Sequence, residues 1–353
     1  MTEDAVRAAL GRVVDPEIRR PITELDMVRA VEVIGSRAKV DLRLTIIGCP
    51  AAATIERDIR AAVLAVPGID ELDLVVGVMT VAEREALVAR LRGTRTTQFG
   101  PDTLTKIYAV TSGKGGVGKS TLTANLAVAL AATGLKIGLI DADVFGFSIP
   151  GILGIVGEKP TKVGDLMMPP VAHGVAVISI GMFVDGSTAV SWRGPLLHRT
   201  IQQFLTDVWF GDLDVLLLDL PPGTGDVAIS IGQLLPHAEV LVVTTPQPAA
   251  AEVAERSGLV ARQTGQTVIG VIENMTGELF GSGGGDAVAA RLDVPVLARV
   301  PLSRGLREGG DSGSPVVLAD PADPAAVAIL SLAATLAART RDLAGRKLPL
   351  IPR

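Results

Sequence analysis

The stretch Thr111-Ser-Gly-Lys-Gly-Gly-Val-Gly-Lys-Ser-Thr121 decides the fold, because it contains the phosphate-binding pattern G-x-x-x-x-G-K-[ST]. Residues 107–110 before it are apolar and partly β-branched, which is typical of a buried parallel strand. Over residues 122–130 after it, leucine and alanine recur at helical spacing. The alternative is a glycine-rich turn that binds no ligand. The Lys119-Ser120 pair in register favours a nucleotide site.

The residue types of this loop suit polyphosphate chemistry. Glycines let backbone N–H groups converge on one point, and the N-terminus of the following helix adds positive potential there. We expect Lys119 to contact the β/γ-phosphates of ATP and the Ser120 hydroxyl to ligate Mg²⁺. The expected nucleotide-binding residues of the loop are Gly113, Lys114, Gly115, Gly116, Val117, Gly118, Lys119, Ser120 and Thr121.

A second lysine, Lys114, stands early in the loop, at a position where an ordinary P-loop does not require one. The wording K-G-G-V-G-K-S-T resembles the deviant Walker A loop of the nitrogenase-reductase/partition-ATPase class. That resemblance implies a homodimer in which Lys114 reaches the nucleotide of the partner subunit and acts in catalysis with Lys119. A solvated surface lysine is the alternative.

Two strands that end in carboxylates complete the predicted site. Asp141 and Asp143 follow the apolar run at 137–140, and Asp219 ends a second apolar run, from residue 215, that leads into Pro-Pro-Gly. Phosphoryl transfer needs Mg²⁺ to be held and water to be oriented, with little covalent chemistry from the protein. We expect Asp219 to hold Mg²⁺ in the manner of a Walker B residue, Asp141 to support the Mg²⁺ shell, and Asp143 to orient the attacking water.

Composition limits the classes of function. The chain has 353 residues, a net charge of −5 and 48% hydrophobic residues, which predicts soluble globular domains without a general nucleic-acid-binding surface. No apolar run is long enough to span a bilayer, and the N-terminus lacks the apolar segment of a signal peptide. We therefore expect a cytoplasmic protein with neither nucleic acid nor membrane as a partner.

The order of apolar segments predicts an α/β fold. Short apolar strands alternate with helices over residues 106–345, which indicates a mostly parallel, doubly wound sheet of the P-loop NTPase type. Residues 1–92 read as a small α/β domain of their own, residues 93–105 as a polar linker, and residues 346–353 as a tail.

The only cysteine, Cys49, follows an alternating strand and precedes a helical stripe. Pro50 suits the first position of a helix, which would make Cys49 the N-cap. The helix dipole would then favour a thiolate able to bind metal or attack an electrophile. The alternative is a packed small hydrophobe.

Motifs in the N-terminal segment include Asp15-Pro-Glu17, residues 23–28 (TELDMV) and residues 44–50 (LTIIGCP). Together they resemble the SufT/PaaD-type iron–sulfur assembly domain. In that family the cysteine matching Cys49 is functional, so the resemblance implies an iron–sulfur role for this thiol.

Motifs in the rest of the chain resemble the Mrp/ApbC family of P-loop ATPases, which carry iron–sulfur clusters. The motifs are residues 141–150 (DADVFGFSIP), Trp192-Arg-Gly-Pro195, Gln202-Gln-Phe204, residues 219–226 (DLPPGTGD) and residues 308–313 (EGGDSG). The resemblance implies slow Mg²⁺-dependent ATP hydrolysis, apo iron–sulfur proteins as clients, and recognition of adenine by Asn274, assisted by backbone near Pro301.

Two departures from that family stand out. The Cys-x-x-Cys insert of cluster-carrying members is missing between Met275 and Gly283, and Phe147 replaces the usual proline. Two subunits would offer only two Cys49 thiolates, whereas a cubane cluster is usually held by four. The leading hypothesis is a dimeric ATPase of iron–sulfur cluster assembly or transfer. The alternatives are an ATPase switch of the partition/positioning class and a metalloprotein-maturation chaperone that holds no cluster itself.

Overall fold

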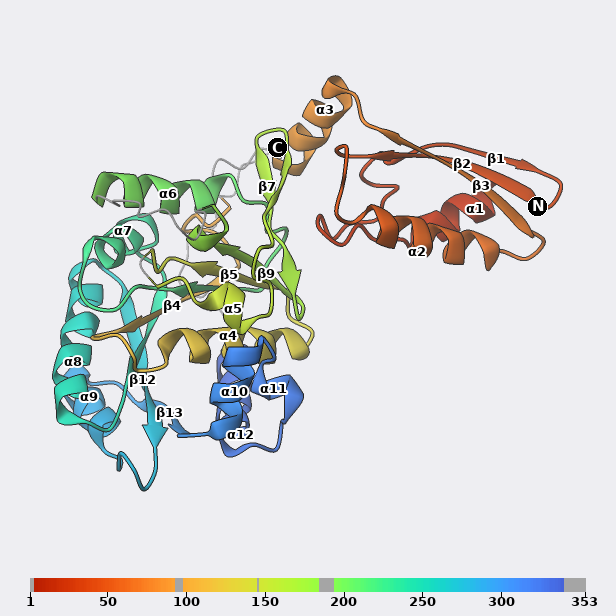
Figure 1. Cartoon of the computed structure of the whole chain (residues 1–353). Helices are drawn as coiled ribbons and strands as arrows, with labels where there is room; N and C mark the ends of the chain where they lie inside the picture. The colour runs from red at the N-terminus through yellow and green to blue at the C-terminus, as the bar shows by residue number, and fades with distance from the viewer. Residues whose placement is uncertain (1–2, 93–97, 145, 184–193, 340–353) are drawn as a thin grey trace, which may run out of the picture. The chain divides into compact units, whose positions relative to one another are not determined.

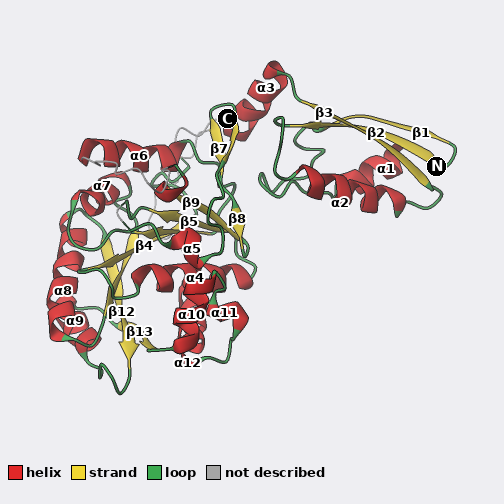
Figure 2. Ribbon diagram, in the orientation of Figure 1, coloured by secondary structure: helices red, strands yellow, loops and turns green. Residues whose placement is uncertain are grey.

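The structure is a computed structural model that describes residues 3–92, 98–144, 146–183 and 194–339. It contains two compact units (Figures 1 and 2). The first comprises Met1–Gln98, Val156–Ala172 and Ala176–Asp212, and the second comprises Phe99–Ile155, His173–Val175 and Leu213–Arg353. The predicted division into residues 1–92, 93–105, 106–345 and 346–353 stays a prediction, and the tail lies outside the described residues.

The first unit contains a three-stranded sheet with the strand order β1-β2-β3. Strand β1 is antiparallel to β2, and β2 is parallel to β3. Side chains of β2 alternate between buried and more exposed positions, so one face of the sheet is covered, as the sequence alternation predicts. The elements are α1 (Glu3–Leu10), β1 (Val28–Ile34), β2 (Arg37–Leu44), α2 (Ala52–Leu64), β3 (Glu71–Val78) and α3 (Val81–Arg92).

The core of this unit draws on residues far apart in the sequence. Leu42 of β2 and Ile55 and Ile59 of α2 are fully buried in it. The same apolar cluster includes Val163 and Leu166 of the antiparallel hairpin formed by residues 161–168. Further elements of this segment are β6 (Thr161–Val163), β7 (Leu166–Met168), β8 (Val171–Ala172), η1 (Ile180–Met182) and α6 (Gly194–Thr206).

The larger sheet has eight strands in the order β13-β12-β11-β4-β10-β5-β9-β8. Every neighbouring pair from β13 to β5 is parallel. Its strands not yet introduced are β4 (Lys106–Ser112), β5 (Ile137–Asp141), β9 (Val175–Ser179), β10 (Val215–Asp219), β11 (Glu239–Thr244), β12 (Thr267–Thr276) and β13 (Val296–Pro301). Strands β5 and β10 are buried along their whole length, which explains why their sequences are continuously apolar up to the terminal aspartate.

Helices form two layers against this sheet (Figure 2). Helix α4 contacts β4, β5 and β10 and is itself covered by α11 and α12, whereas α8 contacts β4, β11 and β12 and is flanked by α7 and α9. The helices are α4 (Lys119–Ala132), α5 (Ile149–Ile152), α7 (Asp226–Leu234), α8 (Pro248–Gln263), α9 (Gly284–Leu292), α10 (Arg304–Ser312), α11 (Val316–Ala319) and α12 (Pro324–Ala338). The predicted α/β, doubly wound P-loop fold is confirmed.

The elements that the sequence did not reveal are mostly short. Strands β6, β7 and β8 have three residues or fewer, and α5 and α11 have four each. Segments of this length contain too few residues to display a period of 2 or 3.6. Among the described residues, no helix is long and apolar enough to cross a membrane.

Candidate nucleotide site

The loop between β4 and α4 has the backbone conformation that its glycines allow. Gly116 and Gly118 have φ angles of 78° and 79°, in the left-handed region that favours glycine. Gly113 is needed for another reason, because a Cβ there would lie 2.1 Å from the backbone carbon of Val253 in α8. Helix α4 begins at Lys119, directly after Gly118, so its first N–H groups adjoin the loop. The predicted phosphate-binding residues are therefore brought together in one cradle.

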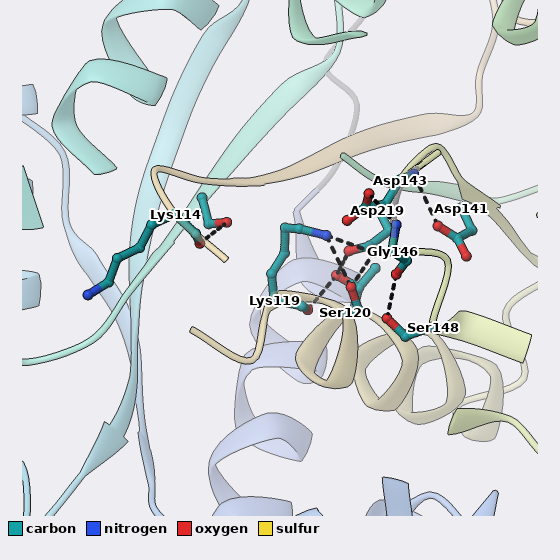
Figure 3. A network of polar contacts seen from close by, with 10 residues as sticks. Lys114, Lys119, Ser120, Asp141, Asp143, Gly146, Ser148 and Asp219 are labelled. Atoms are coloured by element: carbon teal, nitrogen blue, oxygen red, sulfur yellow. Dashed lines mark hydrogen bonds and ion pairs between the residues drawn. The ribbon is translucent and has the colours of Figure 1, made fainter. Parts of the chain in front are cut away.

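A buried polar network joins this cradle to the end of β10 (Figure 3). The Nζ atom of Lys119 lies 2.7 Å from Asp219 Oδ2, and the exposed fractions of the two side chains are only 5% and 0%. Lys119 Nζ also donates to Ser120 Oγ at 3.1 Å, and Ser120 Oγ donates to Asp219 Oδ2 at 2.6 Å. The predicted phosphate-binding lysine thus meets two of the three residues predicted around Mg²⁺, Ser120 and Asp219, at one point. Hydroxyl and carboxylate oxygens are ligands that suit Mg²⁺, so the residues present fit Mg²⁺·ATP.

Thr123 is a member of this network that the sequence reasoning missed. Its hydroxyl donates to Asp219 Oδ1 at 2.9 Å and lies 2.9 Å from the Lys119 carbonyl oxygen. Asp219 therefore has a side-chain partner on each oxygen, which lowers the cost of burying its charge. The spacing in the sequence could have indicated this role, because Thr123 follows Lys119 by four positions and therefore lies on the same face of the helix.

The carboxyl end of β5 lies beside that of β10, because Asp141 and Asp219 are partners in the parallel register. Asp141 is fully buried, and its Oδ1 accepts from the backbone N–H of Asp143 at 3.2 Å. Asp143 is 7% exposed, and its Oδ1 accepts from the Gly146 N–H at 3.0 Å (Figure 3). The two aspartates therefore shape the loop after β5. Their predicted roles around Mg²⁺ and water stay predictions.

Lys114 behaves differently from Lys119. Its side chain is exposed and points away from the Lys119–Asp219 cluster in Figure 3. Its backbone carbonyl accepts from the Ser112 hydroxyl at 3.1 Å, whereas its Nζ atom has no hydrogen bond or ion pair among the described residues. Its predicted contact with the nucleotide of a partner subunit stays a prediction.

Pro301 ends strand β13, and Asn274 lies two residues before the end of the neighbouring strand β12. The amide nitrogen of Asn274 donates to the Val117 carbonyl oxygen in the phosphate loop at 2.8 Å. Pro301 is the register partner of Thr276, two residues beyond Asn274. Both residues lie at the same edge of the sheet as the cradle, and adenine recognition by them stays a prediction.

The structure corrects the prediction for Cys49. Helix α2 begins at Ala52 with Ala51 as its N-cap, so Cys49 precedes the cap instead of occupying it. The thiol is buried and lies 3.7 Å from Glu17 Oε2. The pKa of Cys49 is raised to about 11, chiefly by burial and in part by the nearby Glu17 and Asp15 carboxylates, against a lowering by the backbone N–H of Ala51. The expected dipole-stabilised thiolate is therefore wrong, since the environment favours the protonated thiol.

An iron–sulfur cluster does not fit the residues of one chain. Within residues 3–92, 98–144, 146–183 and 194–339, no group of three or more His, Cys, Asp or Glu side chains is arranged to hold a metal ion. The chain has one cysteine, and its thiol is buried and protonated at neutral pH. Where cluster-carrying relatives of the resembled family have the cysteine pair, Gly277 and Gly281 instead close a tight turn through two backbone hydrogen bonds.

Comparisons with known proteins cover both parts of the chain. A family model described as NUBPL iron-transfer P-loop NTPase matches residues 103–337, and one described as iron-sulfur cluster assembly protein matches residues 3–73. The iron-sulfur cluster carrier protein of Mycobacterium tuberculosis is 52% identical over 99% of this chain and 96% of its own length. These matches confirm the resemblances inferred from the motifs.

Solved structures resemble the nucleotide-binding part. A nucleotide-binding protein of Archaeoglobus fulgidus in complex with ADP is 35% identical, with a TM-score of 0.52 over 59% of this chain and 86% of that one. The septum site-determining protein MinD of Pyrococcus horikoshii, complexed with Mg-ADP, is 28% identical, with a TM-score of 0.54 over 66% of this chain and 96% of that one.

Proposed function

Because this chain belongs to the iron–sulfur cluster carrier family of P-loop NTPases, we propose that it hydrolyses Mg²⁺·ATP slowly and acts in iron–sulfur cluster assembly as a nucleotide-switched homodimer. The observation that carries the proposal is the buried network of Lys119, Ser120 and Asp219 at the phosphate loop. It holds the lysine, the hydroxyl and the carboxylate that Mg²⁺·ATP requires within hydrogen-bonding distance of one another.

Each residue of the network has a role in this proposal. ATP would supply the phosphoanhydride bond that is hydrolysed, and Mg²⁺ held by Ser120 and Asp219 would partly neutralise the charge of the phosphate oxygens. Lys119 exchanges its contact with Asp219 for one with the β/γ-phosphates, which frees the carboxylate to hold Mg²⁺ together with Ser120. Asp141 supports the Mg²⁺ shell, and Asp143 orients the attacking water.

Lys114 supports the dimeric part of the proposal, because its exposed side chain points away from its own cradle. An arginine finger supplied by a partner protein raises the hydrolysis rate about 10³–10⁵-fold. Lys114 would supply a cation to the partner subunit in the same way. The test mixes Lys114→Ala subunits with Asp143→Ala subunits. If Lys114 acts across the interface, half of the sites in a mixed dimer are intact and hydrolysis recovers. Hydrolysis no faster than in either parent would contradict the crossing.

The described residues include no group that fits a cluster, and this favours a second candidate, an ATPase switch that manages apo iron–sulfur clients without holding a cluster itself. Iron and sulfide analysis of anaerobically reconstituted protein separates the two candidates. Cluster binding that is lost in Cys49→Ser would support a carrier that shares the cluster between chains. Wild-type protein that binds neither iron nor sulfide would leave only the switch.

The setting of this activity is proposed from composition. We place the protein in the cytoplasm, and its net charge of −5 supports protein clients over nucleic acid or an anionic membrane surface. A positioning ATPase would instead sediment with anionic vesicles in the presence of ATP. Such co-sedimentation would overturn this part of the proposal.

A further inference from the structure

The side chain of Asn274 connects strand β12 to the phosphate loop. It is 3% exposed, and its Nδ2 atom donates to the Val117 carbonyl oxygen at 2.8 Å across 157 positions of sequence. The approach is close, because a Cβ at Gly118 would lie 2.3 Å from the same nitrogen. Its φ of 79° favours glycine at position 118, and a Cβ there would also displace the Asn274 amide from the loop.

The backbone around Asn274 is shaped for this contact. The register between β12 and β13 shifts between Asn274 and Thr276, and Met275 at the shift has a φ of 60°. A left-handed conformation at a non-glycine residue costs free energy that the surrounding contacts must offset. An irregularity of this kind in a strand changes the direction in which neighbouring side chains point. Here the strand is irregular directly next to the residue that contacts the phosphate loop.

We propose that Asn274 is a positioning residue for the phosphate loop, and that this role is independent of any contact with the base. In a trans peptide the C=O and the following N–H point in opposite directions. The bond that holds the Val117 carbonyl toward Asn274 therefore turns the Gly118 N–H away from Asn274. With the peptide fixed in this orientation, its N–H is preorganised as a phosphate donor and need not be ordered when the ligand binds.

The two polar atoms of the Asn274 amide have separate tasks in this proposal. The nitrogen is occupied by the loop, whereas Oδ1 has no hydrogen-bond partner among the described residues. An acceptor remains for an amino group of a base, which is the role that family resemblance assigns to this residue. A ligand that has phosphates and no base separates the two tasks.

The test rests on nucleotide binding under the proposed function and compares two ligands by calorimetry, ATP and inorganic triphosphate, both with Mg²⁺. In Asn274→Ala the loop loses one net hydrogen bond, so we expect triphosphate to bind about fivefold to tenfold more weakly. The affinity of this variant for ATP should fall by at least the same factor. If triphosphate affinity is unchanged while ATP affinity falls, Asn274 reads only the base and the proposal is overturned. It is also overturned if neither affinity falls.

Asn125→Ala is the matched control. Asn125 is also buried, but its Nδ2 donates to the Thr121 carbonyl inside helix α4 at 2.9 Å, and its Oδ1 accepts from the Val317 N–H at 3.4 Å. We expect triphosphate affinity within about twofold of wild type, because the carbonyl it holds is already fixed by the helix. Asn274→Ser covers the case in which Asn274→Ala does not fold, since its shorter side chain cannot span to Val117. Wild-type protein that binds neither ATP nor triphosphate would refute the proposed nucleotide binding itself. Equal binding by wild type and all variants would instead refute only the positioning role of Asn274.

Discussion

Cys49 is expected to react as a protonated, buried thiol, and this can be measured at a single site because the chain has no other cysteine. Burial and the nearby carboxylates raise the thiol pKa from 9.0 to about 11. Only the thiolate is nucleophilic, so a rise of about two units in the pKa lowers the thiolate fraction at neutral pH about a hundredfold. The assay follows the rate of reaction with a disulfide reagent such as DTNB from pH 7 to pH 11. Measured in native protein and again in urea, it gives one pH profile for the folded chain and one for the unfolded chain.

The midpoint of the profile decides the outcome, because burial also slows reagent access at every pH. We expect the native midpoint to lie well above the midpoint in urea. Glu17→Gln should lower the native midpoint, since it removes the negative charge beside the sulfur that favours the neutral thiol. The midpoint should still exceed 9.0, because burial is the larger cause. Thr161→Val is the control, since it leaves the Glu17 carboxylate in place. A native midpoint below that in urea would refute the reasoning.

The same pKa shift has a consequence for stability. A thiol whose pKa is higher in the folded state contributes stability that is fully present below the unfolded-state value of 9.0. This contribution is lost as the pH rises through about 11. Urea unfolding of wild type and Cys49→Ser between pH 8 and pH 11 should therefore show a stability difference that changes with pH. A difference independent of pH would contradict the assignment.

Three further predictions concern the nucleotide site. Lys119→Ala should abolish most ATP binding in calorimetry, because the phosphates lose their main cation, and near-normal affinity would contradict its role. Asp143→Ala should keep ATP bound while phosphate release falls about 10²–10⁴-fold, the usual contribution of general acid–base catalysis; hydrolysis at the wild-type rate would mean that another group orients the water. Thr123→Val should lower the free energy of unfolding by about 1–3 kcal/mol, since Asp219 Oδ1 loses its hydroxyl donor. Thr123→Ser should restore most of that loss, and unchanged unfolding in Thr123→Val would refute the contact.

The local parts of the site could be predicted from the sequence because their determinants are local. The phosphate loop is read from glycine, lysine and serine at fixed spacing between a strand and a helix. The placement of Asp141 and Asp219 beside it follows from one rule, that parallel strands bring their carboxyl ends to the same edge of a sheet. These predictions needed no knowledge of side-chain packing.

Tertiary structure decided the parts that depend on contacts between distant segments. The pKa of Cys49 depends on burial and on Glu17, which is 32 positions away, and these outweighed the helix N-terminus that local sequence suggested. Asn274 contacts a loop 157 positions away, and Thr123 acquires its role only when β10 brings Asp219 against α4. Burial and the identity of a hydrogen-bond partner are properties of the packed chain, because they depend on which segments exclude water from one another.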